Sequence, residues 1–385
     1  MNRESSLEMV LGITIGLIFV AIAAYRSGKV PSPGVVGRGA AIGLLSYALL
    51  AAPIFTHHGM TLIGLIALLI MIGLALWGSG LATKHVAPKT TAATALRMIA
   101  AIGFACALLI AAAQTLSLLG NVDPRILIIV LLVAVGFMVA GQGLVASSRI
   151  SSTAMWFMLV PMLLALALGI FLGSPKVAVT PIREIDPFPI WGMICGFIAV
   201  FALSWIDGSL ARDRASSDWS TKRSAIWAIV VGLVFGWGQL MLFGGAVFAP
   251  SMEFFVVPAN VDMLPYLVTV LLAVGTVILA AFIARSFASI GVIGLDLAGG
   301  AAAQSADDVA EGELDAPRYA VSNKWVWIGG VIAAIIALLG APMTWVLAVA
   351  AIAAILVIIM SFTSNAEDAV APASKATPAE ADASS

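Results

Sequence analysis

Long apolar runs separated by short polar segments make up most of the chain between residues 7 and 361. A helix needs about 20 mostly apolar residues to cross about 30 Å of hydrocarbon. The pattern therefore predicts eleven transmembrane helices. Their expected positions are near 7–25, 35–55, 60–82, 93–119, 126–146, 153–173, 188–206, 224–249, 262–285, 325–342 and 344–361.

Two segments fall outside this pattern. Residues 301–324 are acidic and predict a cytoplasmic linker, and residues 364–385 predict a disordered tail of Ala, Ser, Pro and Glu. The tail has too little apolar content to form a packed core. The expected organisation is a transmembrane bundle over 1–300, then the linker, the last two transmembrane helices within 325–363, and the tail.

The composition agrees with an all-α integral membrane protein. The chain is 62% hydrophobic and 10% charged, whereas a soluble domain carries about 25% charged residues. The net charge of −1 gives no reason to expect a nucleic-acid partner. The lipid bilayer is the expected partner, and the abundance of Ala, Gly and Val indicates a bacterial source.

The basic residues predict the orientation of the helices. With the N-terminus outside, four of the nineteen Lys and Arg residues fall on the outer side and the other fifteen fall inside. The outer four are Arg3, Arg125, Lys176 and Arg183. Because cytoplasmic loops are enriched in Lys and Arg, this bias predicts a multi-pass protein of the cell (plasma or inner) membrane, with its C-terminus in the cytoplasm.

Sequence signatures of soluble enzymes are missing. The chain has no G-x-x-x-x-G-K-[ST], H-E-x-x-H, C-x-x-C or G-x-S-x-G pattern. We therefore expect no enzyme, no catalytic residue, no cofactor and no metal site. The adjacent His57 and His58 are interpreted as solvated loop residues, since a metal site would need further ligands.

A few polar residues interrupt the apolar spans. Each can bond a carbonyl of its own helix or a neighbouring helix, but together they are the candidates for a substrate pocket within the bundle. The candidate substrate-binding residues are Ser46, Tyr47, Gln114, Ser204 and Gln239.

Several short stretches, taken in their order along the chain, point to one family. They include Tyr25-Arg26, Val36-Gly37-Arg38, Ala113-Gln114-Thr115, the run from Gly141 to Ser148, the inner-loop motif of Arg212, Asp218 and Arg223, and the run from Gly275 to Leu297 with its Asp296. The chain resembles the solute:sodium symporter family, in its cation/acetate and monocarboxylate-type branch, as a divergent and C-terminally shortened member.

This resemblance implies an inverted-repeat transporter fold. The family has one leading helix followed by two repeats of five helices, and eleven spans divide in the same way. An odd number of helices in each repeat places the two repeats in opposite orientations, as inverted topology requires. Residues 1–300 would then hold the leading helix, the first repeat and most of the second.

The departures from the family bear on sodium. In the ninth expected helix, Ala280 and Ala281 stand where the resemblance implies hydroxyl ligands. Sodium, like other hard cations, needs oxygen ligands, so we interpret this as a degenerate ion site. Arg285 is expected near the inner end of that helix. It either extends to the lipid boundary or, if it faces a cavity, takes the place of a cation or attracts a carboxylate.

Two functions follow as hypotheses. The first is a secondary transporter for a small organic solute, with a monocarboxylate as a candidate, that works without the family's sodium coupling. The alternative is a non-transporting, symporter-like scaffold or accessory subunit that acts through another membrane protein. We favour the first, because the family resemblance implies transport, although the loss of polar residues from the second and seventh helices favours the alternative.

Overall fold

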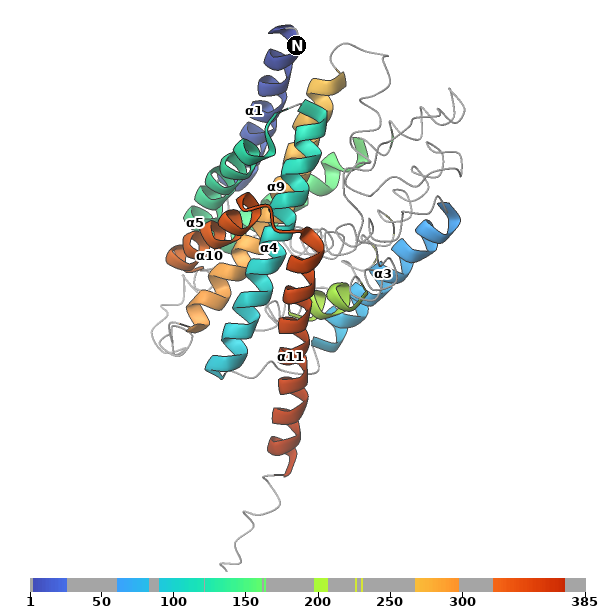
Figure 1. Ribbon diagram of the computed structural model, residues 1–385, viewed down its shortest axis with the longest axis vertical. Helices are drawn as coiled ribbons and strands as arrows, with labels where there is room; N and C mark the ends of the chain where they lie inside the picture. The colour runs from blue at the N-terminus through green and yellow to red at the C-terminus, as the bar shows by residue number, and fades with distance from the viewer. Residues whose placement is uncertain are drawn as a thin grey trace, which may run out of the picture.

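The computed structural model describes residues 3–25, 61–82, 90–120, 122–160, 163, 197–206, 226, 230, 267–297 and 321–370. These residues form helices and no strand. The labelled helices in Figure 1 are α1 (Arg3–Tyr25), α3 (Thr61–Ala82), α4 (Thr91–Gly120), α5 (Pro124–Phe157), α9 (Leu267–Leu297), α10 (Asn323–Leu338) and α11 (Met343–Val370). The expected helix at 35–55 lies outside the described residues, as do the expected helix at 224–249 apart from residues 226 and 230, most of the linker 301–324, and the tail beyond Val370.

Length and apolar character show that the described helices belong in a membrane. Four of them, in α4, α5, α9 and α11, are long and apolar enough to cross a bilayer. Large apolar side chains such as Ile22 of α1, Phe137 of α5 and Trp345 of α11 are exposed on the outside of the bundle. Exposing such apolar side chains to lipid costs no free energy, whereas exposing them to water is unfavourable. The prediction of an all-α membrane protein is confirmed for the described part of the chain.

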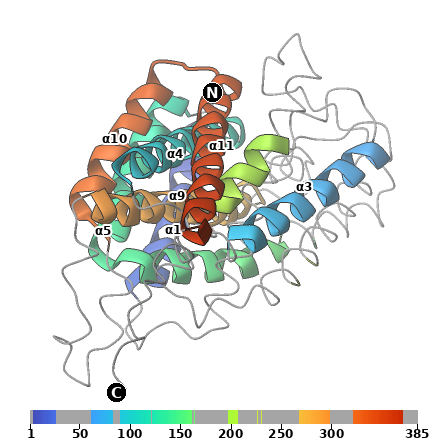
Figure 2. The same cartoon turned by 90° about the horizontal axis from the view of Figure 1, so that it is seen from below.

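Helix α9 is the central element of the bundle. It contacts α1, α4, α5 and α10, which surround it in Figure 2. Glycines make two of these contacts close. A Cβ atom on Gly16 of α1 would lie 2.7 Å from the carbonyl oxygen of Ala273, and a Cβ on Gly294 of α9 would overlap the side chain of Trp325 in α10. Small residues at such positions allow helix backbones to approach each other in a membrane.

The same contacts give the relative directions of the helices. Gly12 and Gly16 of α1 meet Thr269 and Thr276 in the same order, so α1 and α9 run parallel. By contrast, Arg97 and Ala101 of α4 meet Asp296 and Ser286 in reverse order, so α4 and α9 run antiparallel. The alternation of the expected spans requires both relations. These contacts agree with the topology, although they do not give the side of the membrane.

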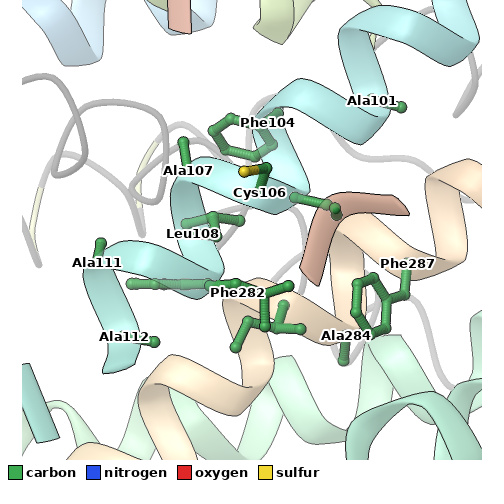
Figure 3. Packing of buried hydrophobic residues seen from close by; sticks show 14 of the residues in the cluster. Ala101, Phe104, Cys106, Ala107, Leu108, Ala111, Ala112, Phe282, Ala284 and Phe287 are labelled. Atoms are coloured by element: carbon green, nitrogen blue, oxygen red, sulfur yellow. The ribbon is translucent and has the colours of Figure 1, made fainter. Parts of the chain in front are cut away.

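Small and aromatic side chains fill the space between α4 and α9. Figure 3 shows Phe282 and Phe287 of α9 in one apolar cluster with Leu108 and Ala111 of α4. All four side chains are buried. Alanines on α4 leave room for the two rings, which is how a jigsaw of large and small side chains reaches the packing density of a protein interior.

The structure corrects one expected boundary in α5. Residues 147–152, expected to form a loop between two spans, are helical, and α5 is interrupted instead at Gly143, where φ is 61° and ψ is −144°. A backbone with this φ favours glycine. The polar residues Ser147, Ser151 and Ser152 suggested a loop, but they are buried against the rest of the bundle, and their hydroxyls do not prevent helix formation there.

Two helix ends also lie further along the chain than expected. Helix α9 continues to Leu297 rather than ending at residue 285, and α11 continues to Val370 rather than 361, so residues 364–370 of the expected tail are helical. Helix α10 ends at Leu338 rather than 342, and α11 begins at Met343 rather than 344, so the turn between them falls earlier than expected. There Gly340 has a φ of 77°, its N–H donates to the carbonyl of Ala337, and the N–H of Ala341 donates to that of Ile336. This is a Schellman motif, which satisfies the last carbonyls of α10.

Candidate functional site

The expected ion site on α9 lies deep in the packed core. Ala280 and Ala281 are both fully buried, and an alanine side chain offers no oxygen to a cation. The nearest hydroxyl toward the N-terminus of α9 is that of Thr276, one turn before Ala280. Its Oγ1 is buried and has no hydrogen-bond partner in the part of the chain that the structure describes.

Other hydroxyls on these helices behave differently from that of Thr276. The hydroxyl of Thr115 in α4 donates to the carbonyl of Ala111 at 2.8 Å, and that of Ser289 in α9 donates to the carbonyl of Arg285 at 3.1 Å. Such bonds satisfy a buried hydroxyl within its own helix. Thr276 is packed against Gly16 instead. A buried polar atom without a partner is uncommon, so this hydroxyl is either a cost of the close packing or a group that binds water or a solute.

In the structure, Arg285 lies within α9 rather than near the end of that helix. Because α9 continues to Leu297, Arg285 lies twelve residues (285 to 297) before the end of a candidate membrane span. It is half-buried, as are Ser289 and Asp296, whereas residues 271–284 are all buried. Positions 285, 289 and 296 share one helix face at 100° per residue. This polar face occupies the C-terminal part of α9.

The polar face of α9 meets a charged residue of α4. The guanidinium Nη1 of Arg97 lies 3.8 Å from the carboxylate Oδ2 of Asp296. Arg97 is 2% exposed and Asp296 is 21% exposed. Charged side chains within transmembrane helices are rare and are kept where they pair or act. From the sequence, Arg97 was expected only to contribute to the orientation of the helices.

Two of the five candidate substrate-binding residues lie within the described helices, and the structure does not bring them together. Ser204 donates its hydroxyl to the carbonyl of Phe201 at 2.9 Å and lies against Gly78 of α3. Gln114 is eleven residues from Gly103, which places both on the α4 face that contacts Ala350 of α11. The Oε1 atom of Gln114 is buried without a partner among the described residues.

The other residues that the sequence analysis singles out as candidates lie outside the described residues. They are Ser46, Tyr47 and Gln239 of the substrate set, Arg212, Asp218 and Arg223 of the inner-loop motif, and the histidines at 57 and 58. Within the described residues, no group of three or more His, Cys, Asp or Glu side chains is placed to hold a metal ion.

Sequence reasoning overlooked both Arg97 and Thr276. The signal for Arg97 was weak, because a basic residue five positions into an expected helix is ordinary at a membrane surface. The sequence signal for its partner, Asp296, was stronger. Arg285 and Asp296 are spaced by eleven residues, three turns of a helix, and this spacing predicts a helix that continues beyond Arg285 with a polar face.

Comparison with solved structures finds similar proteins, among them the following two transport proteins. One is a Na⁺-coupled sialic acid symporter in a substrate-bound outward-open state, with 12% identity, a TM-score of 0.47, and coverage of 94% of this chain and 83% of that chain. The other is a manganese transporter from Eremococcus coleocola, with 11% identity, a TM-score of 0.37, and coverage of 93% and 77%. No family model and no curated protein matches the sequence. At these identities and scores, the two similarities assign neither a solute nor an ion to this chain.

Proposed function

We propose that this chain is a secondary transporter for a small organic solute and that it works without family-type sodium coupling. The observation that supports this most directly is the composition of α9. Two fully buried alanines occupy the expected ion position, while a permanently charged arginine lies further along the same helix within the span. A fixed guanidinium supplies the positive charge that a bound cation otherwise brings.

The proposed solute is a small carboxylate. Arg285 offers a planar donor group that matches a carboxylate, and Ser289 lies one turn away on the same face. The Thr276 hydroxyl and the Gln114 amide oxygen add buried polar atoms elsewhere in the bundle. Ser46, Tyr47, Ser204 and Gln239 remain candidate contacts. The chain would then act in transport and not as an enzyme.

Uptake into proteoliposomes tests this proposal. Labelled acetate, pyruvate and propionate are offered with an inward sodium gradient and with an equal potassium gradient. We expect uptake of at least one acid at equal rates in the two gradients. Arg285→Gln should reduce uptake about tenfold or more, corresponding to about 1.4 kcal/mol, and Arg285→Lys should retain part of it. Arg125→Gln, at the exposed start of α5, is the matched control and should leave uptake unchanged.

Sodium-dependent uptake would overturn the reading of Ala280 and Ala281. The absence of uptake of any acid would favour the alternative, a symporter-like scaffold or accessory subunit. Close packing of α9 against Gly16 and against Trp325 supports that alternative, because interdigitated helices resist the rocking that transport requires. If the chain is such a scaffold or subunit, a second membrane protein should purify with it in fixed stoichiometry.

A further inference from the structure

The pair formed by Arg97 and Asp296 joins two helices at one end of the bundle. Arg97 lies in the second turn of α4, and Asp296 is the penultimate residue of α9. Because these helices run antiparallel, the pair sits where the start of one meets the end of the other. Helix ends move farthest when a bundle opens, so a contact at this position controls the separation of α4 from α9 more than one at the midpoint.

Burial of this pair is costly. Removing two charges from water takes several kcal/mol per ion, and well-packed apolar side chains of similar volume are often equally or more stable in such a place. Arg97 is nevertheless among the largest fully buried side chains of the described residues. A pair retained at such cost favours a role in specifying or switching a conformation, for which buried ionic groups are best attested.

Apolar contacts make up most of the remaining interface between α4 and α9. It consists largely of alanine and aromatic side chains, as Figure 3 shows. A second polar contact there, from the Ser286 hydroxyl to the carbonyl of Ala101, spans 3.5 Å, which is long for an O–H···O hydrogen bond. Apolar contacts have no preferred direction, whereas the contact between Arg97 and Asp296 is directional.

We propose that Arg97 and Asp296 form an ionic latch that holds the start of α4 against the end of α9 and closes the bundle there. The latch opens when the two charges separate and become hydrated, and the interface beside Ser286 then admits water. This role rests on the proposed transport function, since closing and opening one end of a bundle serves alternating access.

Labelling of a cysteine placed in the interface tests the latch. The full chain carries Cys106→Ala and Cys195→Ala, so that Ser286→Cys supplies the thiol, in proteoliposomes without solute. N-ethylmaleimide is the probe. Because Ser286 is buried, the parent should label slowly. Asp296→Asn should raise the rate about tenfold, about 1.4 kcal/mol, because it leaves the deeply buried Arg97 without this carboxylate.

Two further variants identify the latch: one should raise the labelling rate by less, and the other should reverse the increase. Arg97→Gln should raise the labelling rate less than Asp296→Asn, because the carboxylate that it leaves is more exposed. The exchange Arg97→Asp with Asp296→Arg should return labelling to within about threefold of the parent, a tolerance of about 0.7 kcal/mol. Lys324→Gln, which neutralises an exposed residue at the start of α10, should have no effect.

Unchanged labelling in a folded Asp296→Asn protein would overturn the latch, as would an exchanged pair that labels as fast as the single variant. Should Asp296→Asn fail to fold, Asp296→Glu, which keeps the charge but displaces it, replaces it with the same two outcomes. Labelling requires no solute. The latch can therefore fail while uptake persists, or persist in a chain that takes up none of the acids.

Discussion

The two halves of α9 differ in what surrounds them. The N-terminal half, from Leu267 to Ala284, packs against α1 through Gly12 and Gly16, and its side chains are buried from residue 271 onward. The C-terminal half, from Arg285 to Leu297, carries both charged residues of the helix. It also meets Arg97 of α4.

This difference changes where chemistry is expected on the helix. The family resemblance directs attention to Ala280 and Ala281, which lie in the tightly packed half. Within that half a deep hydroxyl, that of Thr276, is left without a partner among the described residues. Groups able to bind an anion lie in the other half. Close packing and charged groups therefore occupy different parts of the same helix.

The largest expected effect comes from filling the close contact in the C-terminal half. In Gly294→Ala the new methyl would overlap Cβ and Cγ of Trp325, which cannot move without displacing α10. Overpacking of this kind costs about 3 kcal/mol. Gly275→Ala on the same helix is the control, because its methyl would find only Leu116 Cδ2 at 3.9 Å. It should be neutral or stabilise by about 0.5 kcal/mol.

Thermal unfolding of the two variants in detergent measures this difference. A lower melting temperature for Gly294→Ala with an unchanged or higher one for Gly275→Ala is the expected result. Equal melting temperatures would show that the contact between α9 and α10 is looser than the structure indicates. The polar half of α9 would then be free to move independently of α10.

A smaller change in stability should show whether the hydroxyl of Thr276 is unpartnered or binds water or a solute. Thr276→Val replaces the hydroxyl by a methyl of similar size and removes a buried polar atom without a partner, so it should stabilise the protein by about 1 kcal/mol. Thr115→Val is the control. It removes a hydroxyl that donates to Ala111 at 2.8 Å and should destabilise by about 1 kcal/mol.

Chemical or thermal unfolding gives the sign of each change. A stabilised Thr276→Val protein would show that the N-terminal half of α9 is purely a packing surface. If Thr276→Val is instead destabilised, or loses uptake of an acid, then Thr276 binds water or solute, and the two halves of α9 share the function.

The smallest expected effect is that of sodium itself. Replacing 100 mM potassium by 100 mM sodium should leave the melting temperature unchanged, because Ala280 and Ala281 offer no side-chain oxygen. A site with a Kd of about 1 mM would instead stabilise the protein by about 2.7 kcal/mol. Melting of the purified protein in the two salts measures this directly, with choline as a third salt to exclude an effect of potassium. A rise in melting temperature that is specific to sodium would indicate that an ion binds in the N-terminal half of α9.

Much of the helical framework was predictable from hydropathy. The predicted span 93–119 matches α4 (Thr91–Gly120) within two residues at each end. Two of the errors coincide with polar residues. The expected spans stopped at Arg285 and before the serines flanking Arg149, whereas these residues lie on helices that bury their apolar neighbours. A polar residue ends a span only when all faces of the helix there meet water or headgroups.

The candidate site was less predictable than the framework. The absence of side-chain oxygens at Ala280 and Ala281 was visible in the sequence, because it concerns residue types alone. The contact of Arg97 with Asp296 was not, because it joins two helices far apart in the chain, and their relative rotation depends on packing. Nor could spacing show that Gln114 belongs to the face of α4 that meets α11.

The contact of α1 with α9 has a consequence for biosynthesis. Gly16 and Ala273 are 257 residues apart (273 minus 16), and at about 5–20 residues per second a ribosome takes roughly 10–50 s to add that length. During that interval α1 is already made but lacks its principal neighbour. Assembly of the bundle therefore waits for a late helix, and a nascent chain interrupted before residue 267 leaves Gly12 and Gly16 of α1 without the helix that packs on them.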